Sequence, residues 1–153
     1  MRTLTPHFHQ RGLAMVETAI TLPLLLFVML AATEITNAFV THTTLTKAVR
    51  DGARWAAEEA IDTTGFNLTP ALKVEVQNLV VYGNRKGTGT PIVDGLAPEY
   101  VTVTRIGTSD NIEVRVRNYP YTGILGTVLP TFGYGSEIAL LFNLDATVTM
   151  RAL

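Results

Sequence analysis

This chain is organised around the segment Leu13-Ala-Met-Val-Glu-Thr-Ala-Ile-Thr-Leu-Pro-Leu-Leu-Leu-Phe-Val-Met-Leu-Ala-Ala32, in which Glu17 is the only charged residue. An α-helix rises ~1.5 Å per residue, so the segment would span ~30 Å, about the thickness of a bilayer's hydrocarbon core. A cleavable secretory signal has a shorter apolar core followed by a small-x-small cleavage site, and Leu30-Ala31-Ala32 is a poor version of that site. The sequence therefore predicts a retained transmembrane helix over residues 13–32.

The flanking charges predict how this helix is oriented. Arg2 and Arg11 precede it, whereas Glu34 is the first charge after it and Lys47 the next. Lys and Arg are enriched on the cytoplasmic side of membrane helices. We therefore expect the N-terminus in the cytoplasm and the bulk of the chain outside.

Two residues distinguish the start of the segment from a generic anchor. Gly12 stands immediately before it, after a basic and polar leader over residues 1–12 that shows no helical or strand period. Glu17 lies inside it, where an ionisable group costs ~2.5 to 3.5 kcal/mol at the centre of a span. Glu17 is expected either to snorkel to the nearby headgroups or to find a cationic partner.

Helix-forming sequence continues beyond the span. Residues 45–60 are dense in helix formers, and Arg54 with Glu58 forms an i,i+4 pair of opposite charge. We expect an extramembrane continuation of the helix over residues 33–62, ended by Gly65. A helix from residue 13 to residue 60 would be ~72 Å long, so its outer half must pack on something.

Small residues recur every four positions along that outer half, at Ala48, Gly52, Ala56 and Ala60. Such a ridge lets another helix or a sheet approach closely. Two alternatives stay open at this point, packing over the chain's own core and packing between subunits.

Residues 66–153 are expected to form a small head domain. Thr69-Pro70 is typical of a helix start and Gly83 of a helix end, while residues 100–106, 112–117 and 144–150 alternate with a period of two. The predicted fold is α+β and pilin-like, with a long N-terminal helix and a second helix packed on a three-stranded antiparallel sheet. An apolar excursion over residues 119–135 separates the last two strands, and we favour its tucking over the sheet rather than contacting a partner.

The composition excludes several classes of function. Net charge is −1 and there is no cysteine, which argues against nucleic-acid partners, disulfides and thiolate sites. Outside the leader, His42 is the only histidine, and Ser109 and Ser136 are the only serines. No nucleotide or metal motif is present, and His7 with His9 lacks further ligands. We expect no catalytic, cofactor or metal site and no small-molecule substrate.

Several motifs together resemble TadE-like proteins, the minor pseudopilins of the tight-adherence (Flp) pilus. They lie at residues 11–17, 22–26, 34, 48–57, 119–121 and 144–151. The resemblance implies that a prepilin peptidase cleaves between Gly12 and Leu13. Thr18 departs from the pattern, since members commonly carry an aromatic residue after the glutamate.

Cleavage would free an α-amino group at Leu13, about one helical turn from Glu17, and a buried carboxylate could pair with that amine on a neighbouring subunit. The resemblance further implies a non-enzymatic subunit of the bacterial inner membrane. Its domain would be periplasmic, or at the cell surface if built into the pilus. Expected partners are the peptidase, other pilins or pseudopilins, the assembly machinery and membrane lipid. The alternatives are a tethered binding domain outside any filament and a secreted enzyme behind an unusual signal.

Overall fold

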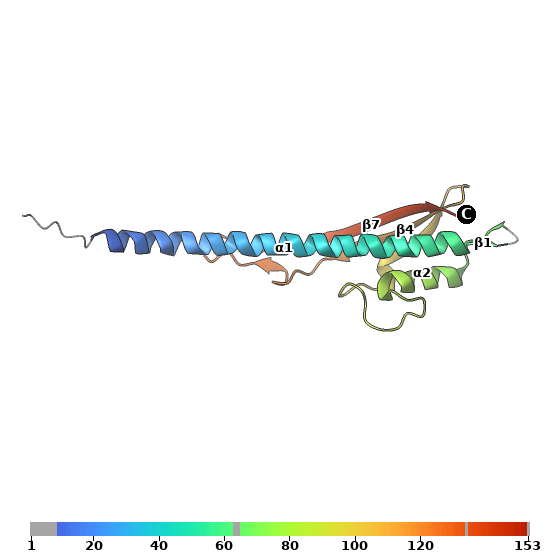
Figure 1. Ribbon diagram of the computed structural model, residues 1–153, viewed down its shortest axis with the longest axis horizontal. Helices are drawn as coiled ribbons and strands as arrows, with labels where there is room; N and C mark the ends of the chain where they lie inside the picture. Colours follow the sequence, from blue (N-terminus) through green and yellow to red (C-terminus); the bar gives the residue numbers. More distant parts are fainter. Residues whose placement is uncertain (1–8, 63–64, 134, 153) are drawn as a thin grey trace, which may run out of the picture.

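One long helix runs along most of the length of the molecule. The computed structural model describes residues 9–62, 65–133 and 135–152, and its first element is α1 (His9–Glu59). The helix continues through Pro23 without a break and is long and apolar enough to cross a membrane, with a mean hydropathy of 2.2 over its most apolar window. Figure 1 shows that its N-terminal turns project beyond the rest of the described chain. Residues 9–12, expected to be irregular, are helical, and residues 1–8 of the expected leader lie outside the described residues.

The C-terminal end of α1 differs from the prediction. The helix ends at Glu59, and Ile61–Asp62 (β1) pairs with Gly65–Phe66 (β2) as a short antiparallel hairpin. Gly65, with a φ of 112°, therefore belongs to this hairpin and is not the residue that ends the helix. The prediction was wrong here because polar and glycine residues in a row are equally typical of a helix stop and of a tight turn.

The second helix, α2 (Pro70–Tyr82), forms where the sequence predicts it. The side-chain oxygen of Thr69 accepts a hydrogen bond from the backbone N–H of Leu72 at 3.1 Å, and Pro70 occupies the first turn. Gly83 ends the helix in the left-handed conformation, with a φ of 69°. Both ends of α2 are thus set by capping residues that lie next to the helix in the sequence.

The sheet confirms the predicted α+β class. After a short 3-10 helix, η1 (Pro98–Tyr100), the strands β3 (Val101–Ile106), β4 (Asn111–Pro120) and β7 (Asn143–Arg151) form one antiparallel sheet in the order β3-β4-β7. Alternate residues of β3 and β4 are buried, so one face of the sheet packs against α1 and α2. A register shift between Val116 and Tyr119 interrupts the pairing of β4 with β7.

The core lies between the outer half of α1, α2 and this sheet. Apart from Tyr119, its buried members are aliphatic or small, and alanine dominates the contribution of α1. Fully buried members include Leu45, Val49, Ala53, Ala56, Val76, Val80, Ile112, Val114 and Val116. Because small residues on α1 face valines on α2, the two helices lie close together, and α2 is seen beside the outer end of α1 in Figure 1.

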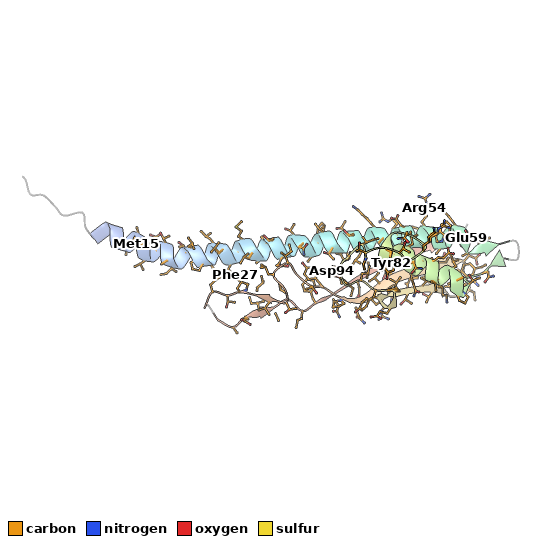
Figure 2. All side chains as sticks on the ribbon, turned by 90° about the horizontal axis from the view of Figure 1, so that it is seen from below. Met15, Phe27, Arg54, Glu59, Tyr82 and Asp94 are labelled. Atoms are coloured by element: carbon orange, nitrogen blue, oxygen red, sulfur yellow. The ribbon has the colours of Figure 1, made fainter. Side chains whose placement is uncertain are left out.

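The apolar excursion does not tuck over the sheet as expected. It contains a second small hairpin, β5 (Val128–Leu129) paired with β6 (Ile138–Ala139), which lies beside the part of α1 that carries Phe27 (Figure 2). Ile20, Pro23, Leu24 and Phe27 of α1 share a groove with Thr131, Ser136 and Ile138 of this segment. The excursion therefore runs back from the sheet along the apolar half of the helix.

Candidate processing site and assembly surface

The predicted cleavage point lies near the free end of α1. Gly12 and Leu13 are both exposed, and a Cβ atom added at Gly12 would have no heavy atom within 4 Å. Terminal turns of helices open at little cost in free energy. A protease could therefore reach the bond between these residues without disturbing the core.

Glu17 is exposed on the next turn of α1. Its backbone carbonyl accepts a hydrogen bond from the hydroxyl of Thr21 at 2.9 Å. Within the part of the chain that the structure describes, its side-chain carboxyl has no hydrogen-bond or ion-pair partner. The structure places Gly12, Leu13 and Glu17 within about one and a half helical turns of one another near the start of α1, as their spacing predicts.

The surface around Glu17 is apolar on all sides. Exposed side chains with fractions of 51–76% include Leu13, Met15, Val16, Ile20, Leu22, Leu24, Leu25, Val28 and Met29. A helix that is apolar around its whole circumference needs lipid or other protein around it. Ile35 and Phe39 extend this surface beyond residue 32, with exposed fractions of 70% and 71%.

The small-residue ridge lies inside the chain. Ala48, Gly52, Ala56 and Ala60 are all buried. A Cβ atom added at Gly52 would come within 2.5 Å of Val80 Cγ2 and 3.4 Å of Val76 Cγ1, both on α2. Of the two alternatives that the sequence left open, the structure shows the first: the ridge lies in the chain's own core, with Gly52 against the second helix.

The structure brings together a further site that residue spacing did not predict, centred on Glu34. This side chain is 3% exposed, and its carboxyl oxygens face the start of the excursion. The backbone N–H of Leu125 donates to Oε1 at 2.6 Å, and the hydroxyl of Tyr121 donates to Oε2 at 3.2 Å. No lysine, arginine or histidine among the described residues forms an ion pair with it. Glu34 thus ties the excursion to α1 through hydrogen bonds alone.

Neighbouring residues complete this tether. Asn37 Nδ2 donates to the hydroxyl of Tyr121 at 2.7 Å, which leaves the hydroxyl proton free for Glu34. Burial raises the pKa of Tyr121 above its usual value, and the hydrogen bond to Glu34 raises it further, against the opposite effect of Asn37. The hydroxyl therefore remains a donor at neutral pH. A Cβ at Gly123 would collide with the Glu34 carboxyl group, so glycine is required for this approach.

Sequence reasoning identified the parts of this tether but not their contact. Glu34 and the 119–121 motif both belong to the family resemblance, yet 87 residues separate Glu34 from Tyr121. A hydrogen bond between such distant residues has no periodic signature in one sequence. The sequence does carry one signal of this contact, an acidic residue at the end of an apolar run, because a buried carboxyl group requires a hydrogen-bond partner.

We predict that Glu34→Ala releases the excursion from α1. The backbone N–H of Leu125 and the hydroxyl of Tyr121 would lose their acceptor, and a buried donor left without an acceptor costs about 1 to 3 kcal/mol. Amide hydrogen exchange at Leu125 should therefore accelerate markedly, whereas Glu34→Gln, which keeps an acceptor oxygen, should have a smaller effect. The matched control is Glu59→Ala, an exposed glutamate on the same helix. Unchanged exchange at Leu125 in Glu34→Ala would show that the tether does not hold the segment.

The described residues contain no group of three or more His, Asp or Glu side chains placed to hold a metal ion.

Comparison with known proteins finds one family match. Residues 12–54, less than a third of the chain, match the family model described as TadE-like protein, which confirms the resemblance over this range. The matched range contains Gly12, Glu17, Glu34 and Gly52 and ends before the sheet. No curated protein and no solved structure shows significant similarity to the chain.

Proposed function

We propose that this chain, with its TadE-like N-terminal third, is a minor pseudopilin of a tight-adherence (Flp) pilus that acts in pilus assembly or initiation and in surface adhesion. It is anchored by residues 13–32 in the bacterial inner membrane, with its head in the periplasm. A prepilin peptidase removes the leader after Gly12. Its partners are that peptidase, membrane lipid, other pilins or pseudopilins and the assembly machinery.

The observation that carries this proposal is the exposed end of α1. Gly12 and Glu17 lie inside the family match, on the N-terminal turns of α1, which extend beyond the rest of the described chain. The head buries its own core at the opposite end of the helix. The exposed end is therefore free for a protease, for lipid and then for other helices.

The proposed chemistry links processing to assembly. Cleavage of the peptide bond after Gly12 adds water across it and creates a charged α-amino group at Leu13. Glu17 lies four residues further on, and its carboxyl group is unpartnered among the residues that the structure describes. In low dielectric an ammonium–carboxylate pair between two subunits is strongly favoured over two separate charges. The pair would set the register of a subunit against its neighbour as it leaves the bilayer.

Intact-mass measurement of the protein purified from cells that make such pili tests the proposal. Loss of residues 1–12 is the expected result. Recovery of the uncut chain would contradict it and favour a membrane-tethered periplasmic binding domain outside any filament. A first residue beyond Ala32 would instead favour a secreted protein.

We predict that Glu17→Ala leaves membrane insertion intact and impairs assembly. The substitution removes the costly ionisable group from the span, so insertion should not suffer. It also removes the partner of the new amine, so the amount of pilus recovered by shearing should fall. Glu59→Ala is the control, because it deletes an exposed carboxyl from the same helix at its other end. Piliation of the Glu17→Ala strain at the wild-type level would exclude the pairing.

A further inference from the structure

The segment between the second and third strands of the main sheet is almost free of charge. From residue 118 to residue 144, between Arg117 and Asp145, Glu137 is the only charged residue. We refer to residues 122–142 as the apolar loop. Its exposed large side chains are Ile124 (67%), Leu125 (39%), Phe132 (47%), Ile138 (46%), Leu141 (75%) and Phe142 (41%). A loop in contact with water alone does not expose such a surface.

The apolar loop continues the apolar surface of α1. Its base is held at Glu34, two residues beyond the predicted end of the span, by Leu125 and Tyr121. From there it runs toward the N-terminus of α1, and its hairpin lies beside the helix near Phe27 (Figure 2). The loop and the span therefore form one apolar surface on the membrane side of the head.

This position conflicts with a bilayer around residues 13–32. The groove residues Ile20 and Phe27 lie twelve and five residues before Ala32, or ~18 and ~8 Å below the outer end of the span. A loop in that groove would lie in the hydrocarbon. β5 and β6 pair at only two positions, Val128 with Ala139 and Leu129 with Ile138. Each unsatisfied backbone group in hydrocarbon costs several kcal/mol, so an open hairpin of this kind is excluded from lipid.

We infer that the apolar loop is a second lipid-contacting element. While α1 spans the bilayer, the loop lies in the headgroup region of the outer leaflet, and it occupies the groove beside residues 20–27 only when those residues are outside the hydrocarbon. The inference rests on the transmembrane anchor of the proposed function.

Lipid fits this surface better than a soluble partner. The tether at Glu34 holds the base of the loop at the level of the headgroups, where Ile124 and Leu141 can insert while backbone groups remain hydrated. Because the loop carries only one charged residue, Glu137, little charge must be desolvated when the loop enters the headgroup region. The same scarcity of charge leaves little to specify a polar protein surface.

Depth-dependent fluorescence quenching tests the inference on the full chain. Because the chain contains no cysteine, Ile138→Cys provides a single site for an environment-sensitive dye. The labelled protein is reconstituted into phosphatidylcholine vesicles that contain lipids spin-labelled either near the headgroup or near the acyl terminus. Leu141→Cys, at a more exposed position, is the second probe in case the first perturbs β6.

The controls are Leu25→Cys, exposed within the span, and Ser109→Cys, at the turn between β3 and β4. We expect the shallow quencher to reduce the fluorescence of both loop probes more than the deep one, the deep quencher to act on Leu25→Cys, and neither to act on Ser109→Cys. Deep quenching of the loop probes, or none, would overturn the inference while Leu25→Cys still reports an inserted anchor. Absence of quenching at Leu25→Cys would show that α1 is not inserted in the bilayer, and it would contradict both the proposed anchor and this inference.

Discussion

Substitution Gly12→Asp is expected to abolish removal of the leader and, with it, piliation. The site is open in the structure, and a Cβ atom added there would have no heavy atom within 4 Å. The substitution therefore leaves the fold of the head and the helix unaffected, and its effect falls on recognition by the peptidase. Intact mass of the membrane fraction measures processing, and sheared fibre measures assembly.

The control for Gly12→Asp is Thr3→Asp, which introduces the same charge into the leader away from the cleavage point. This variant should be processed normally if the position, rather than the net charge of the leader, decides cleavage. Normal removal of residues 1–12 from the Gly12→Asp protein would exclude Gly12 as the recognition residue.

The largest expected effect on stability is that of Gly52→Val. A Cβ at this position would approach Val80 Cγ2 to 2.5 Å, and valine adds two further methyl groups, so α2 must move away from α1. Overpacking of this kind costs about 3 kcal/mol, at the upper end of its usual range. Denaturant unfolding in detergent, followed by the fluorescence of the single Trp55, measures the loss.

Asp51→Val is the matched control for Gly52→Val, because it places the same side chain on the adjacent exposed position of α1. It should change the free energy of unfolding by less than ~1 kcal/mol. The milder variant Gly52→Ala should recover stability when Val80→Ala makes room for it, a coupling expected only of residues in contact. Equal stability of Gly52→Val and wild type would mean that α1 and α2 do not pack as described.

The elements predicted most closely are those with local signals. Thr69 and Gly83 bound α2 as expected, because a cap acts on the backbone next to it. The strands followed from alternation, since Val101, Val103 and their neighbours can bury only one face of the sheet. The roles proposed for Gly12 and Glu17 come from the family resemblance, because no periodicity in the sequence indicates them.

The sequence-based predictions were wrong where contacts between residues distant in the sequence determine the structure. Gly65 was predicted as a helix stop but forms a hairpin with Ile61 and Asp62. The excursion was expected over the sheet, yet Glu34 holds it against α1 through a residue 91 positions away in the sequence. Hydrophobicity indicates that a segment is buried somewhere, but not which of two apolar surfaces it covers.

Because α1 is unbroken from His9 to Glu59, it resists twisting about its own axis, and its two ends keep a fixed rotation relative to each other. Each residue of an α-helix turns the axis by about 100° and advances it by ~1.5 Å, so the azimuth of the head is locked to that of Glu17. Inserting one alanine between them would swing the head by about 100° around the axis of α1, whereas inserting seven would return it to within about 20° of its original bearing. If contacts at the N-terminal end of α1 fix the orientation of each subunit, every subunit would present the same side of its head to its neighbours.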